Sequence, residues 1–243
     1  MQSPALTSLS IAAAITLAPA LFAGPREVPL SVEKVYIPQG FDDNDNVEIA
    51  LKGTFKSSCF KIGRNAAKVD HEAREIAISA TAIEYDGVCA DALVPFLDVV
   101  KVGVLKDGPY KVLVNQNNQV SAKVEIARRT TEAPDDYLYA PVASAEIKQD
   151  RGTKRQALHL EGQYPFLFVG CMKIREVRVV KGPSEILVVQ PITDIIDTAE
   201  CEDRQGNQDY ELNVPMEQAF QGDGLLHVRV LNGASLNKLI SFP

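Results

Sequence analysis

CFKI at residues 59–62 and CMKI at residues 171–174 repeat one four-residue pattern, and a second cysteine follows each first cysteine after thirty residues. The flanking sequence repeats in the same order. Before the cysteines LKG at 51–53 corresponds to LEG at 160–162, and far downstream KDGPYKVLV at 106–114 corresponds to GDGLLHVRV at 222–230. Matching segments separated by small insertions are typical of a diverged tandem duplication. The sequence therefore predicts one domain that occurs twice.

The four cysteines form two pairs with the same spacing. Four cysteines allow three disulfide pairings, and the repeated spacing favours Cys59 with Cys89 and Cys171 with Cys201. In the chain-entropy model, a disulfide that closes a loop of this length stabilises its domain by about 3 to 4 kcal/mol. A zinc site is the alternative, but it is disfavoured because such sites use close C-x-x-C pairs, which this sequence lacks.

The segments between these anchors alternate apolar and polar residues with a period of two. Residues 47–52 and 120–126 show the alternation, and the continuous apolar run at 186–192 indicates a more deeply buried strand. Residues 64–77 have a helical composition, but their counterpart in the second copy contains β-branched residues and a Gly-Pro turn, so we predict a hairpin in both copies. No helix is expected in the mature chain.

These patterns predict an all-β protein of two tandem immunoglobulin-like β-sandwich domains that arose by internal duplication. We place the first domain at residues 26–128 and the second at 142–243. The polar segment 129–141, with prolines at 134 and 141, is expected to be a short linker.

The first 25 residues contain no charged side chain and are rich in Ala, Leu and Ile. The apolar stretch is shorter than the roughly twenty residues that a membrane-spanning helix needs. We therefore expect a signal peptide at residues 1–23, cleaved after Ala23 or after Ala20, and a protein that is periplasmic or secreted. Disulfides agree with an oxidising compartment outside the cytoplasm.

The first copy resembles modules of exported bacterial proteins. The shared pattern is a cysteine before a hairpin, a second cysteine about thirty residues on, a Pro-aromatic pair at 95–96, and a closing G-x-Y-x-V-x-V-N, here residues 108–115. Such modules look like small immunoglobulin-like β-sandwiches, usually without assigned activity. The resemblance implies the same fold for this domain and brings no catalytic residue.

Composition and motifs argue against several functions. The net charge of −7 and the absence of tryptophan disfavour a nucleic-acid or sugar-stacking surface. His71 lies in a predicted turn, His159 and His227 lie on the polar side of predicted strands, and all three are expected to be surface residues. No catalytic motif accompanies them, so we expect no enzyme, no cofactor and no metal.

A compact acidic run, Asp42 to Glu48, has oxygen ligands dense enough for calcium, and a second acidic cluster, at residues 193–203, is more scattered and a weaker candidate. The first run lacks the Gly and Glu of an EF-hand loop. A solvated loop leading into a strand is the expected structure, and calcium binding stays open as the alternative.

The best candidate for partner binding precedes and includes the CMKI stretch. Here polar TFKSSC of the first copy is replaced by apolar QYPFLFVGC, and a basic strand follows. If exposed, these side chains would form an interaction patch, although a buried core strand and a solvent-facing strand are the alternatives. The candidate residues are Tyr164, Pro165, Phe166, Phe168, Lys173 and Arg175.

Three functional hypotheses follow from this sequence. The first is a non-enzymatic protein-interaction or adhesion module with a protein or envelope component outside the cytoplasm as its partner, no nucleic acid, and no integral membrane segment. The second is a soluble protease inhibitor that presents a loop or edge strand, for which residues 164–169 are the candidate. The third is an envelope hydrolase that uses the acidic clusters.

Overall fold

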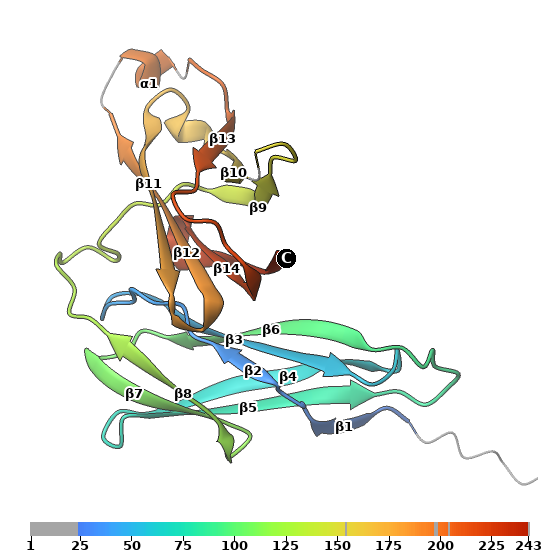
Figure 1. Ribbon diagram of the computed structural model, residues 1–243. Helices are drawn as coiled ribbons and strands as arrows, with labels where there is room; N and C mark the ends of the chain where they lie inside the picture. The colour runs from blue at the N-terminus through green and yellow to red at the C-terminus, as the bar shows by residue number, and fades with distance from the viewer. Residues whose placement is uncertain (1–23, 154, 197–198, 204, 243) are drawn as a thin grey trace, which may run out of the picture.

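The computed structural model describes residues 24–153, 155–196, 199–203 and 205–242. The predicted signal peptide, residues 1–23, lies outside the described residues. The described chain forms two β-sandwiches, each built from two sheets, and Figure 1 shows the second standing on one face of the first.

The first sandwich pairs a five-stranded sheet with a three-stranded sheet around one core that includes Ile49, Leu51, Ile76 and Val112. The larger sheet contains β1 (Arg26–Pro29), β4 (Phe60–Asp70), β5 (Glu75–Glu84), β7 (Gly108–Val114) and β8 (Asn117–Ile126), and the smaller contains β2 (Lys34–Tyr36), β3 (Val47–Phe55) and β6 (Val94–Gly103).

The second sandwich pairs a four-stranded sheet with a three-stranded sheet around a separate core that includes Leu158, Leu160, Leu187 and Val189. The larger sheet contains β11 (Met172–Gly182), β12 (Ile186–Ile195), β14 (Gly222–Val230) and β15 (Ala234–Phe242), and the smaller contains β9 (Val142–Gln149), β10 (Gln156–Gln163) and β13 (Asp209–Pro215).

The strand order is the same in the two sandwiches. The order β2-β3-β6 corresponds to β9-β10-β13, and β4-β5-β7-β8 corresponds to β11-β12-β14-β15. In both, the second and third strands of the larger sheet are parallel, whereas immunoglobulin sheets are antiparallel. The predicted all-β class with two tandem sandwiches is confirmed, and the parallel pair is a departure from immunoglobulin strand order.

The parallel pairing shows that β7 and β14 correspond with an offset two residues different from the alignment that the sequence predicted. Ile76 pairs with Val112 in the first sandwich, and Leu187 pairs with Leu226 in the second. Val112 therefore corresponds to Leu226 and not to Val228. The sequence could not resolve this, because a shift of two keeps every side chain on the same face.

Each copy has an aromatic ring packed over a glycine at an equivalent place. Gly53 on β3 pairs with Phe96 on β6, and Gly162 on β10 pairs with Tyr210 on β13. A Cβ added to either glycine would lie within 2.6 Å of the facing ring. The rings can cross the sheet only because no side chain stands there, so these glycines are required by packing.

Both predicted disulfides are present, Cys59–Cys89 and Cys171–Cys201, with Cα–Cα distances of 5.4 Å and 4.6 Å. Cys59 directly precedes β4 and Cys89 lies between β5 and β6, and likewise Cys171 directly precedes β11 and Cys201 lies between β12 and β13. The pairing is confirmed, and the disulfides indicate an oxidising location outside the cytoplasm.

Among the described residues, helical structure is limited to short turns. The expectation of no helix missed α1 (Ala199–Asp203), which carries Cys201, and the 3-10 turns η1 (Phe166–Phe168), η2 (Pro183–Glu185) and η3 (Leu231–Gly233). None of the helices in the described ranges is long and apolar enough to cross a membrane.

The two sandwiches dock through the outer faces of one sheet each. Tyr36 and Ala50 of the β2-β3-β6 sheet form a buried cluster with Ile186, Val188 and Leu225 of the β12-β14 region. Strand β12 is thus covered on both faces, by its own core on one and by the first sandwich on the other. This explains the continuous apolar run that the sequence shows at residues 186–192.

Candidate functional site

The candidate partner-binding residues lie at the end of the second sandwich away from the first, beside α1 (Figure 1). Residues 166–168 form the turn η1, and Phe166 is 61% exposed and Leu167 64% exposed. The condition of exposure is therefore met, and the buried core strand that the continuous apolar run at residues 166–169 indicated is wrong.

Further apolar residues surround the same loop. The backbone N–H of Cys171 donates to the carbonyl of Phe168, and the N–H of Ile196 donates to the carbonyl of Cys171. Ile195 and Ile196 are also exposed. We call this surface the apolar tip, consisting of Phe166, Leu167, Phe168, Ile195 and Ile196. Contiguous exposed apolar surface marks interaction sites in soluble proteins.

Tyr164 and Pro165 support the tip more than they extend it. Both are half-buried, the Tyr164 ring lies 4.9 Å from the Tyr210 ring, and burial raises the pKa of the Tyr164 hydroxyl. Tyr164 and Lys173 line one surface hollow of about 290 Å³ together with Gln205 to Asn207. The structure therefore brings these two candidates together beside the apolar tip.

Arg175 does not join this hollow. Its guanidinium donates to the Asp194 carboxylate on β12 at 2.9 Å, and both side chains are about half exposed. Arg178, further along β11, pairs with Glu176 at 2.8 Å. Carboxylates of the same sheet thus neutralise these two charges of the predicted basic strand, which disfavours an anion-binding role.

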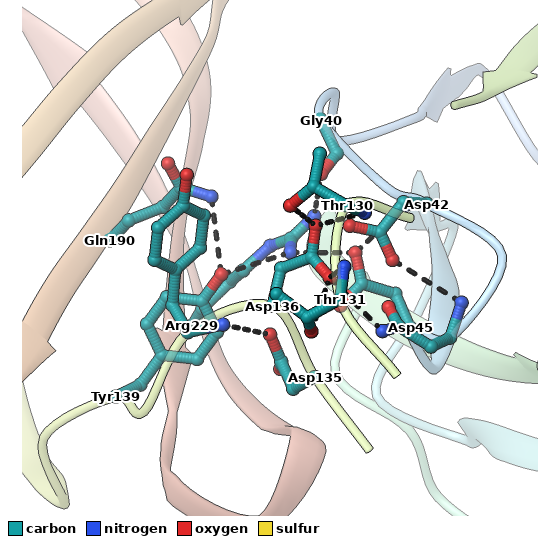
Figure 2. A network of polar contacts seen from close by, with 12 residues as sticks. Gly40, Asp42, Asp45, Thr130, Thr131, Asp135, Asp136, Tyr139, Gln190 and Arg229 are labelled. Carbon is teal, nitrogen blue, oxygen red and sulfur yellow. Dashed lines mark hydrogen bonds and ion pairs between the residues drawn. The ribbon is translucent and has the colours of Figure 1, made fainter. Parts of the chain in front are cut away.

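A second polar site, which the sequence did not predict, lies where the two sandwiches meet (Figure 2). Arg229 on β14 donates to the Asp45 carboxylate at 2.8 Å and to the Tyr139 hydroxyl at 3.2 Å. It also donates to the Gly40 carbonyl and lies over the Phe41 ring. The Arg229 and Asp45 side chains are only 7% and 4% exposed, so this is a buried ion pair between domains.

The segment 129–141, predicted to be a linker, folds into this junction. Asp136 accepts hydrogen bonds from the backbone and hydroxyl groups of Thr130 and Thr131 and from the Asn44 amide. Although burial opposes its ionisation, these donors hold the pKa of Asp136 below its ordinary value. Tyr139 is buried and bridges to Ile192 of β12. The segment therefore contacts both sandwiches.

The acidic run at residues 42–48 is neither a solvated loop nor a group arranged for calcium. Asp45 is 4% exposed and Glu48 6% exposed. Glu48 accepts hydrogen bonds from Ser235 and Asn237 of the second sandwich, and Asp43 accepts one from the Arg129 backbone. Protein donors occupy these carboxylates, and among the described residues no cluster of His, Cys, Asp and Glu is arranged to hold a metal ion.

The junction raises the pKa of two carboxyl groups, Asp42 and Asp135. Burial, and next the charge of Asp45, raise the pKa of Asp42 to about 6, and burial raises the pKa of Asp135. Burial opposes the charge on Arg229, but Asp45 and Tyr139 together outweigh it, and the pKa of the guanidinium is raised. A cavity of about 20 Å³ beside Arg229 and His227 has room for roughly one water molecule.

Two of the three histidines contradict the expectation of surface residues. His71 is exposed in its turn, as predicted. His159 and His227 are only 3% and 1% exposed. The prediction that both side chains point away from the core of their sandwich was correct, but other groups cover them on that side. The first sandwich covers His227, and Glu161 and Glu211 flank His159 at 2.9 Å and 3.5 Å.

His227 makes folding sensitive to acid. Burial lowers its pKa from 6.5 to about 4, while its Nδ1 contacts the Asn237 amide oxygen. Between these values the unfolded chain binds a proton that the folded chain does not, so stability falls as pH falls from 6.5 to 4, by up to about 3 kcal/mol. Asp42, with its raised pKa, works in the opposite direction over part of this window.

We therefore expect His227→Gln, which retains a donor for Asn237, to lose this acid sensitivity. Urea unfolding of both proteins at several pH values gives the difference in stability between them, in which the Asp42 contribution cancels. That difference should change in favour of the variant as the pH falls. A difference independent of pH would contradict the burial of an uncharged His227.

These observations define a disulfide-bearing β protein of two packed sandwiches, with an exposed apolar tip and a buried polar junction. A family model described as the ORF11 beta-sandwich domain matches residues 49–126, which run from β3 to the end of β8. The match supports the β-sandwich part of the resemblance noted in the sequence. Neither the curated proteins nor the solved structures gave a match.

Proposed function

We propose that the protein is a non-enzymatic, periplasmic or secreted interaction module that binds another protein through the apolar tip. The observation that carries this proposal is the exposure of Phe166 and Leu167 on a turn held beside the Cys171–Cys201 disulfide. Aromatic and large apolar side chains on a fixed backbone lose little conformational freedom when a partner covers them, which favours binding.

The alternative of a protease inhibitor has less support. A segment that enters a protease cleft as an edge strand is extended, whereas Phe166–Phe168 forms a 3-10 turn. The shape of the segment therefore favours docking of a convex apolar tip into a partner's groove.

The test is partner capture by the exported protein from the extracellular or periplasmic fraction of its own cells. Phe166→Asp and Leu167→Asp should each remove the captured protein, because a charge would be buried against an apolar partner surface. Val104→Asp is the matched control, since Val104 is 55% exposed on the first sandwich. Equal capture by wild type and both tip variants would overturn the proposal. Stoichiometric inhibition of a protease, lost in Phe166→Asp, would instead support the inhibitor.

A further inference from the structure

The two sandwiches dock through faces of different kinds. The first uses the outer face of its β2-β3-β6 sheet, and the second uses the outer face of its β12-β14-β15 region. We call these the three-strand face and the four-strand face. Because both sandwiches have the same strand order, each sandwich has one face of each kind. In the part of the chain that the structure describes, the four-strand face of the first sandwich and the three-strand face of the second take no part in the contact between the sandwiches.

The internal contact relieves a repulsion between like charges. Lys34 and Lys52 lie directly opposite each other on β2 and β3. Like charges at such positions destabilise a sheet. The second sandwich supplies a carboxylate to each lysine, Glu185 to Lys34 at 2.8 Å and Asp223 to Lys52 at 3.9 Å. Docking therefore places opposite charges over a pair that would otherwise repel.

Both open faces carry such like-charged pairs. On the four-strand face of the first sandwich, Lys111 on β7 lies opposite Lys123 on β8, and both are exposed. On the three-strand face of the second, Glu161 on β10 lies opposite Glu211 on β13, and their side chains are 52% and 66% exposed. The two pairs have opposite sign.

The Lys111–Lys123 pair and the Glu161–Glu211 pair occupy positions equivalent to those of residues in the contact between the two sandwiches. Lys52 pairs with Leu97 across β3 and β6, and the equivalent pair in the second sandwich is Glu161 with Glu211. On the four-strand face of the second sandwich, Leu225 on β14 pairs with Leu239 on β15. The parallel strand pairing makes Lys111 and Lys123 the equivalent residues of the first sandwich. Leu97, Leu225 and Leu239 all belong to the buried contact between the sandwiches.

Further charges lie beside both pairs. On the three-strand face of the second sandwich, Lys148 pairs with Glu146, and His159 lies between Glu161 and Glu211. The pKa of His159 is raised, first by the Asn213 hydrogen bond and then by Glu161. On the four-strand face of the first sandwich, Lys68 adds a positive charge, and Asp70, Glu75 and Glu125 add negative ones.

We propose that copies of this chain associate head to tail, with the Lys111–Lys123 face of one copy docked on the Glu161–Glu211 face of the next. In the geometry of the contact inside the chain, Lys111 and Lys123 take the places of Leu225 and Leu239, and Glu211 takes the place of Leu97. Contacts between two unlike faces repeat from copy to copy and form open chains where the rotation between copies does not close a ring. We expect short open chains. This surface is separate from the apolar tip and does not rest on the proposed function.

The first test is sedimentation velocity of the disulfide-intact mature protein over a range of concentrations. Exposed ion pairs are screened by salt, so the average mass should rise with concentration at low ionic strength and return to that of one chain at about 1 M salt. A protein that stays monomeric at low salt, or an association that salt does not weaken, would overturn the proposal.

The second test is a charge swap. Lys111→Glu/Lys123→Glu makes both open faces acidic, and Glu161→Lys/Glu211→Lys makes both basic, so each variant alone should stay monomeric. Mixed in equal amounts, the two should associate again, because each acidic face then meets a basic one. The substituted side chains are exposed, and circular dichroism with an intact-mass measurement of the disulfides checks folding. Failure of the mixture of folded variants to associate would overturn the proposal.

Discussion

Arg229→Met should lower the free energy of unfolding by about 3 to 5 kcal/mol, the range for removing one partner of a buried ion pair. The variant leaves the Asp45 carboxylate buried between the sandwiches without its cation. It also removes the donor to the Gly40 carbonyl and the cation over the Phe41 ring. Because the chain has no tryptophan, unfolding in urea is best followed by far-ultraviolet circular dichroism.

Arg175→Met is the matched control for this prediction. Arg175 pairs with Asp194 at the same kind of distance, but on the surface, where such pairs contribute about 0 to 1 kcal/mol. The double variant Arg229→Met/Asp45→Leu should recover part of the lost stability, since replacing both charges by apolar groups removes the buried unpaired carboxylate. If Arg229→Met cost no more than Arg175→Met, the buried pair would not couple the two sandwiches.

The junction also shows where sequence reasoning stops. Local patterns predicted the strands, the duplication and both disulfides, because alternation and cysteine spacing depend on residues close in the chain or on its internal repeat. Arg229 and Asp45 are 184 residues apart, and the alternation on β14 shows only that Arg229 points outward. Whether this outward face meets water or another domain depends on docking, which the alternation on β14 does not encode.

One local clue to docking was present in the sequence. Residues 186–189 are Ile, Leu, Val and Val, without the polar alternation of a strand that has one wet face. Leu187 and Val189 fill the core of the second sandwich, while Ile186 and Val188 pack on the first. A run that is apolar on both faces therefore indicated an interface as well as a core. The same reasoning would have placed His227 in that interface, since its strand lies beside β12.

Removing either disulfide should destabilise its own sandwich by about 3 to 4 kcal/mol in the chain-entropy model, because both close loops of the same length. The variants are Cys59→Ala/Cys89→Ala and Cys171→Ala/Cys201→Ala, with cysteine separations of 30 residues in each. Urea unfolding with and without a reductant measures the loss. Adding a reductant should destabilise both sandwiches of the wild type. In each variant it should destabilise only the sandwich that retains its disulfide.

The two variants should differ in partner capture. The Cys171 backbone holds both parts of the apolar tip, through its contacts with Phe168 and Ile196, and the disulfide ties it to α1. Losing this bond frees the tip to sample other conformations, which adds an ordering cost to binding. We therefore expect weaker capture by Cys171→Ala/Cys201→Ala and unchanged capture by Cys59→Ala/Cys89→Ala. Equal capture by the two, at equal folded fractions, would mean that the disulfide supports only the fold and that the tip binds without being held in place.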